Sequence, residues 1–263
     1  MLRKLLKYEM KATARLFLPL YSALLIFALI SRFLNPFQSF DTSGNFNLQA
    51  AITIFSGMVY FALIIGVIVM TLLIMIQRFY KNLLGDEGYL MFTLPVKSWM
   101  HIVCKLLVSL LWTILSLLIV ICSILIIVDT KEIFKELPNI INALRGSFGN
   151  AGFIIIPLYA LIATASSILV IYDSIAIGHL FTEHKLLASF GMYCVFYVIY
   201  QTMLVIFIFL FSNTRFANLI VNAAPTPSDL NMFILALTFI SALFVAGHLT
   251  LTNIILKKRL NLE

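Results

Sequence analysis

Six long apolar stretches constrain the fold of this chain more than any other feature. They are roughly Leu16–Leu34, Ala51–Ile76, Leu106–Val128, Ile154–Ile177, Leu186–Phe211 and Phe233–Leu256. Each is about 20 residues or longer, the length of helix that crosses roughly 30 Å of hydrocarbon. The chain of 263 residues is 62% hydrophobic and 11% charged, whereas a soluble domain is about half apolar and a quarter charged. The sequence therefore predicts an all-α integral membrane protein with six transmembrane helices.

The connections between these stretches are too short to form a separate soluble domain. We therefore expect residues 1–263 to form a single transmembrane domain. Its parts are an amphipathic segment at 1–15, a six-span bundle at 16–256 and a basic tail at 257–263. Lys131–Leu137 is expected to form a helical turn or two outside the membrane, and a short half-inserted helix is favoured over a plain loop before Pro225 and Pro227.

The amphipathic segment is read from its helical pattern. Leu2–Arg15 places its basic residues on one arc of a helix and Leu2, Leu5 and Leu6 on the opposite arc, with Glu9 in the middle of the apolar arc. We expect an interfacial helix that sets the angle of the first span. The alternative is that Glu9 pairs with a basic residue of the inner loop or of a partner.

The basic residues are distributed unevenly across the expected membrane. With the N-terminus inside, 13 of the 18 Lys and Arg residues lie on the inner side and 5 on the outer side. This is the positive-inside bias, and an even number of spans places both termini in the cytoplasm. The acidic residues divide 6 and 5, so the whole net charge of +7 lies on the inner face, where it is attracted to anionic lipid. The pattern indicates membrane lipid as a partner and not nucleic acid.

The longest run between apolar stretches, Gln77–Lys105, combines charged and apolar residues. Gly88 and Pro95 break regular structure, and a short helix fits between them on a surface, against a protein or a membrane. We expect this cytoplasmic helix between spans two and three to make the working contact. Its residues are Asp86, Glu87, Gly88, Tyr89, Leu90, Phe92, Leu94 and Pro95.

Polar residues inside the expected spans are costly and need an explanation. In the fifth span, Tyr193, Tyr197, Tyr200 and Gln201 share one helical face. We favour hydrogen-bonded helix packing for this face; the alternative is a substrate path or an interface with a second membrane chain.

Ionisable residues near the inner end of the bundle form one close set, Asp173, His179 and Glu183. In the sixth span, packing or hydration explains His248 and Asn253 more simply than a proton relay does.

Three kinds of chemistry are missing from the sequence. His179, Glu183 and His184 fit neither zinc-binding helix pattern, because the two histidines are five residues apart. There is no G-x-S-x-G motif of a serine hydrolase. None of the 11 glycines precedes lysine, so there is no Walker A phosphate loop. We expect no catalytic residue, metal or cofactor in this chain, and any ATP must be bound by another chain.

The stretch GDEGYLMFTLPVKSWMHIVCKLL resembles the membrane permeases of type-2 ATP-binding-cassette (ABC) exporters. Those permeases carry an acid-Gly-x-Leu segment, then Leu-Pro, then a basic residue that leads into the third span. In this chain the matching residues are Glu87, Gly88, Leu90, Leu94, Pro95 and Lys105. The resemblance extends to the six-span plan, the basic N-terminal helix and the basic tail, and departs at Tyr89, where many relatives carry threonine.

The resemblance implies the transmembrane half of an exporter in a bacterial plasma membrane. Two permease chains, identical or sister chains, would pair, and each would dock on a separate ABC ATPase subunit through the cytoplasmic loop, the coupling helix of the family. ATP and Mg would be bound by that partner ATPase, so the permease itself is not an enzyme. The substrate moved outward would be a peptide, an antibiotic or a lipid-like molecule.

Two other classes of function compete with the exporter. A non-transporting immunity or sensor protein would bind a peptide at the outer surface. An intramembrane enzyme, the weaker alternative, would need ionisable groups that converge at one depth.

The distribution of Lys and Arg predicts which loops can be reached from outside the cell. Single cysteines at Ser43, Asn139 and Ser228 should react with an impermeant thiol reagent in intact cells, because they lie on the expected outer side. Cysteines at Ser98 and Thr182 should not react. Labelling at position 98 from outside would contradict the whole arrangement.

Overall fold

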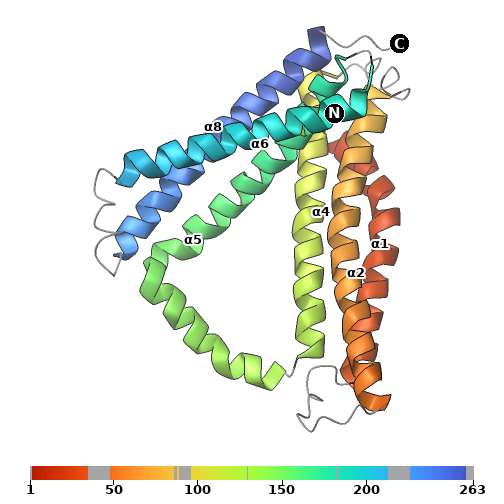
Figure 1. Cartoon of the computed structure of the whole chain (residues 1–263), viewed down its shortest axis with the longest axis vertical. Coiled ribbons are helices and arrows are strands. Elements are labelled where there is room, and N and C mark those ends of the chain that lie inside the picture. The colour runs from red at the N-terminus through yellow and green to blue at the C-terminus, as the bar shows by residue number, and fades with distance from the viewer. Residues whose placement is uncertain are drawn as a thin grey trace. The chain divides into compact units, whose positions relative to one another are not determined.

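The structure, a computed structural model, describes residues 2–34, 48–85, 88, 96–128, 130–181, 183–212 and 226–258 (Figure 1). The regular elements within these ranges are all helices. They are α1 (Leu2–Leu34), α2 (Leu48–Phe79), the π-helix η1 (Tyr80–Leu84), α4 (Ser98–Ile127), α5 (Thr130–Gly178), α6 (Lys185–Ser212) and α8 (Pro227–Lys258).

Six of these helices are long and apolar enough to cross a membrane. This confirms the prediction of an all-helical chain with six candidate spans, and it identifies a multi-pass membrane protein. The cytoplasmic location of both termini, the interfacial helix and the coupling helix stay predictions.

Several helices begin earlier than the apolar stretches that predicted them. α4 begins at Ser98 and α8 at Pro227, whereas the apolar stretches begin at Leu106 and Phe233. Hydropathy detects only the part of a helix that contacts lipid, but backbone hydrogen bonding continues through polar residues at either end. Thr226 shows how such an end is set: its hydroxyl accepts from the backbone N–H of Asp229 at 3.4 Å, and Pro227 occupies the first helical turn.

The N-terminal helix α1 has no interruption at residue 15. It runs for 33 residues, with Pro19 inside it. The amphipathic segment and the first span are therefore one continuous helix. Pro19 lies in the helix interior, where it removes one backbone hydrogen bond.

The segment between the third and fourth spans, predicted to lie outside, is much more helical than the turn or two expected there. α5 starts at Thr130 and contains one non-helical residue, Gly149, with φ 63° and ψ −171°. That positive φ favours glycine, since a side chain would be strained there. The amide nitrogen of Asn231 donates to the carbonyl oxygen of Phe148 at 2.7 Å, so α8 caps a carbonyl group beside the kink.

Backbone contacts divide the chain into two compact units. The first consists of Met1–Gln77 and Leu107–Pro138, and the second of Arg78–Leu106 and Asn139–Glu263. The helices α2, α4 and α5 each contribute residues to both units. The predicted half-inserted helix at residues 216–221 and the basic residues of the tail beyond Lys258 lie outside the described residues.

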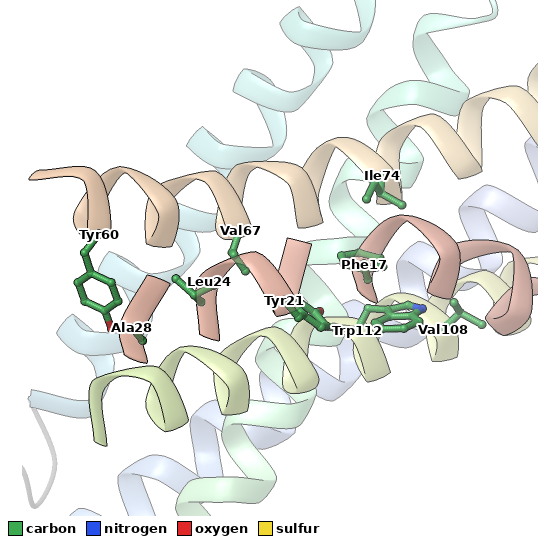
Figure 2. Close-up of a cluster of buried hydrophobic side chains, with 9 residues drawn as sticks. All are labelled: Phe17, Tyr21, Leu24, Ala28, Tyr60, Val67, Ile74, Val108 and Trp112. Carbon is green, nitrogen blue, oxygen red and sulfur yellow. The ribbon is translucent and has the colours of Figure 1, made fainter. Parts of the chain in front are cut away.

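An aromatic and aliphatic cluster forms the core of the first unit (Figure 2). Phe17 of α1 stacks on Trp112 of α4, with ring centroids 4.4 Å apart. The indole N–H of Trp112 donates to the hydroxyl oxygen of Thr13 at 2.7 Å. The remaining core residues come from α1, α2 and α4: Tyr21, Leu24, Ala28, Tyr60, Val67, Ile74 and Val108.

Hydroxyl groups connect the same three helices inside this core. Ser116 of α4 forms hydrogen bonds with Tyr21 of α1 at 2.7 Å and with Thr71 of α2 at 2.9 Å. Further along, Tyr60 bonds Ser123 at 2.8 Å. Hydrogen bonds of this kind join helices in a membrane, where apolar side chains have no preference for one another over lipid.

Candidate functional site

A pocket of about 310 Å³ lies between α5, α6 and α8 in the second unit. Most of its lining is apolar, as in small-molecule sites generally; Val170, Met203 and Phe207 are examples. The polar lining consists of hydroxyl groups. Four belong to tyrosines, which are Tyr159, Tyr193, Tyr197 and Tyr200, and three to serines, which are Ser166, Ser167 and Ser241.

Four residues were predicted to share a face of the fifth span, and only three of them line the pocket. Tyr193, Tyr197 and Tyr200 line the pocket. Gln201 does not line it and is exposed on α6. The next residue along a helix turns about 100° away, so the neighbour of Tyr200 presents its amide elsewhere.

A buried carboxylate lies deeper in the same unit. Asp173 of α5 is 0% exposed, although carboxylates are rare inside membrane spans. One of its oxygens, Oδ2, is bonded to Nδ1 of His248 on α8. The other, Oδ1, accepts from the hydroxyl of Thr252, one turn further along α8. Asp173 thus ties the fourth span to the sixth.

Hydrogen bonds continue from this pair to the pocket. Nε2 of His248 lies 3.0 Å from the hydroxyl oxygen of Tyr200 on α6. That oxygen lies 2.8 Å from Oγ of Ser166 on α5. Tyr200 and Ser166 both line the pocket. Asp173, His248, Tyr200 and Ser166 therefore form one chain, the polar chain, that leads from a buried carboxylate to the pocket wall.

Aromatic rings enclose the imidazole in the middle of the polar chain. Phe196 packs edge-on against His248 with centroids 5.3 Å apart, and Tyr200 lies parallel to it at 5.9 Å. Phe244 stacks on Tyr200 at 4.3 Å. These rings keep water away from the imidazole, so its partners are the carboxylate and the phenol.

The structure gives His248, which was attributed to packing or hydration, a buried carboxylate as a specific partner. Asp173 was grouped with His179 and Glu183 on sequence proximity, but its ionisable partner is 75 residues away. Asp173 and His248 both lie in apolar stretches. Ionisable residues are rare in such stretches, and this rarity was the only signal of the pair in the sequence. Asn253, also attributed to packing or hydration, accepts a hydrogen bond from the Ser98 hydroxyl at 2.9 Å.

The stem of the predicted coupling loop packs on the C-terminal end of α5. After α2, the π-helix η1 (Tyr80–Leu84) ends at Gly85, whose N–H donates to the carbonyl oxygen of Tyr80 at 2.9 Å. Phe79 stacks on Tyr172 of α5 with centroids 4.1 Å apart. π-Helical turns occur frequently at functional sites.

His179, just beyond α5, holds the end of the stem. Its Nε2 lies 3.2 Å from the carbonyl oxygen of Leu84, and its ring packs against Tyr80 at 5.1 Å. Burial lowers the pKa of His179, and the nearby charge of Lys185 lowers it further, against the opposing effect of the Leu84 bond. The imidazole is therefore neutral at pH 7, and its N–H is available to Leu84.

The contact residues predicted in the loop itself lie mostly outside the described residues. This applies to Asp86, Glu87 and to all of residues 89–95. Gly88 is described: it is buried, and its N–H donates to the carbonyl oxygen of Gly85 at 2.8 Å. Within the described ranges, no group of three or more His, Cys, Asp or Glu residues could hold a metal ion.

In comparisons with known proteins, no family model, no curated protein and no solved structure matches this chain.

The pairing of Asp173 with His248 predicts strongly non-additive mutations. His248→Ala leaves a carboxylate buried in the membrane interior and should cost about 3 kcal/mol or more of unfolding free energy. Once Asp173→Ala is present, the same change should cost much less, which gives a coupling of about 1–3 kcal/mol. Unfolding by sodium dodecyl sulfate in bicelles measures the unfolding free energy of the wild-type chain, of each single variant and of the double variant.

The exposed Thr250 on the same helix provides the control. Thr250→Ala, combined with Asp173→Ala, should give additive costs. Additive costs for the His248 and Asp173 substitutions would show that the pair contributes no stabilisation.

Proposed function

We propose that this chain is the transmembrane permease half of an ABC exporter. It moves an amphiphilic substrate such as a peptide, an antibiotic or a lipid-like molecule outward, and a separate ATPase subunit hydrolyses the ATP. Support from the sequence comes from the acid-Gly-x-Leu and Leu-Pro pattern at Glu87–Pro95. The structure adds six helices long and apolar enough to span a membrane.

One structural observation carries the proposal: α5 contacts the loop stem at one end and lines the pocket further along. Tyr172 and His179, at its inner end, hold Phe79 and Leu84. Ser166, two turns away, lines the pocket. A partner that displaces the loop would therefore push on a helix that forms a pocket wall, which is the arrangement an energy-coupled transporter needs.

The contacts of α5 suggest how the displacement reaches the pocket. Ring stacking and the His179 bond connect the stem to α5. The polar chain connects α5 to α6 and α8 through Tyr200 and His248. When ATP brings two ATPase subunits together, the loop moves, α5 shifts, and the three helices around the pocket change their spacing together.

The exposed face of α6 supports a second permease chain as partner. The span Lys185–Leu210 has 0% of its residues buried within the chain. Gln201 presents its amide on this exposed helix, where contact with lipid tails is unfavourable. An identical or sister chain that covers α6 would hydrogen-bond this amide. The pair would lie in a plasma membrane with both termini in the cytoplasm, as the positive-inside bias favours.

The coupling loop is tested by substitutions at its apolar strip. Phe92→Ala or Tyr89→Ala should weaken binding of the ATPase subunit about 30-fold, since truncating a buried aromatic side chain at an interface costs about 2 kcal/mol. Asp86→Ala, which changes a charge at the rim, should cost less. Co-purification of the ATPase with each variant, and with the charge reversal Glu87→Lys, gives the order of these effects.

The outcome separates an exporter from its alternatives. A sensor or an intramembrane enzyme needs no ATPase on this loop. If Phe92→Ala, Tyr89→Ala and Glu87→Lys all retain the ATPase and its hydrolysis rate, the loop is a membrane-surface connection and the proposal fails.

A further inference from the structure

The pocket between α5, α6 and α8 offers no charged group to a ligand. None of the described residues that line it is acidic or basic, and Asp173 lies behind the wall. A ligand that carried a net charge would lose its hydration without gaining a counter-ion. The lining therefore suits a neutral molecule. The hydroxyl groups of the lining determine which polar atoms that molecule should carry.

Electrical neutrality fixes the number of protons on the Asp173–His248 pair. Its hydrogen-bond partners are Thr252 and Tyr200, which are both uncharged, and the pair lies in membrane-spanning helices. An unbalanced negative charge at such a site costs several kcal/mol. The pair is therefore neutral as a whole, either as carboxylate with imidazolium or as carboxylic acid with imidazole.

With the Thr252 hydroxyl donating to Asp173, both neutral arrangements put a hydrogen on the same ring nitrogen. Thr252 Oγ1 lies against Oδ1 of Asp173 and also 2.9 Å from the carbonyl oxygen of His248. When its hydroxyl donates to Oδ1, the proton that the pair shares lies between Oδ2 and Nδ1 of His248. If it lies on Nδ1, the imidazolium also carries a hydrogen on Nε2. If it lies on Oδ2, Nδ1 accepts it, and the neutral ring again has its hydrogen on Nε2.

Counting hydrogens along the rest of the polar chain leaves one for the pocket. Nε2–H, the Tyr200 hydroxyl and the Ser166 hydroxyl supply three hydrogens. They fill two bonds, from Nε2 to Tyr200 and between Tyr200 and Ser166. Among the described residues Ser166 makes no further hydrogen bond, although it is only 4% exposed and lines the pocket. One O–H, from Tyr200 or Ser166, is thus left without an acceptor.

We infer that the pocket binds a neutral amphiphile whose polar group is a hydrogen-bond acceptor, such as an ester or amide carbonyl, placed at Ser166 and Tyr200. The apolar part of the ligand contacts side chains such as Val170, Met203 and Phe207. The inference rests on the proposed export function only for the role of the pocket as a substrate site. The chemistry of the site follows from the polar chain itself.

The test measures ligand preference on the isolated chain in nanodiscs, without an ATPase. The photoprobe is methyl dodecanoate with a diazirine in its alkyl chain, and mass spectrometry locates the labelled residues. Unlabelled methyl dodecanoate should compete for labelling of pocket residues about fivefold better than tridecane, the gain of one net hydrogen bond. Dodecyl sulfate and dodecyltrimethylammonium should compete no better than tridecane.

Two matched double variants assign that preference to the polar chain. Ser166→Ala with Tyr200→Phe removes both hydroxyls that can supply the unused hydrogen, so the fivefold preference should fall to about one. Ser167→Ala with Tyr197→Phe removes two lining hydroxyls outside the polar chain and should keep the preference. Equal competition by tridecane in each variant and in the wild-type chain checks that the pocket is intact.

The inference is overturned if the probe labels no pocket residue, if ester and alkane compete equally in the wild-type chain, or if a charged competitor is preferred. It is also overturned if the first double variant keeps the preference. None of these results alters the co-purification of the ATPase, so the ligand class and the export function fail separately.

Discussion

A carboxylate that lies inside a membrane-spanning helix must be compensated, and the arrangement of the second unit depends on how this is done. Asp173 is fully buried on α5 and is compensated by His248 and Thr252 of α8. Removal of either partner would leave polar groups in a medium that cannot hydrate them. The requirement therefore fixes the fourth span against the sixth. Tyr200 then adds α6 to the pair through the second ring nitrogen of His248.

The helix α5 is the common member of the contacts that matter for function. Its C-terminal end receives the loop stem through Tyr172 and His179 and also holds Asp173. Ser166, about two turns before Asp173 on the same helix, lines the pocket. A rigid helix with contacts at both levels can transmit a displacement along its axis without any change in its own structure. The first unit has a different kind of core, in which hydroxyl pairs and the Phe17–Trp112 stack join α1, α2 and α4.

The six spans could be predicted from the sequence because hydropathy is a local property, and a run of about 20 apolar residues has few other uses. The shared face of Tyr193, Tyr197 and Tyr200 was also predictable, since helical spacing determines it. The partner of Asp173 was not predictable: it is 75 residues away, and the packing of three helices decides which rare polar residues meet. The extra length of α5 was missed because its N-terminal part, residues 130–148, is too polar to read as a span.

The location of the hydrogen on Nε2 of His248 is the claim on which the chemistry of the pocket depends. Solid-state nitrogen NMR of the chain with labelled histidine, in lipid near pH 7, measures it directly, and the His248→Gln variant identifies the signal among the 4 histidines. The account predicts a protonated Nε2 with a hydrogen bond to an oxygen. An unprotonated Nε2 that accepts from Tyr200 would contradict it, because no hydrogen would then be left for the pocket.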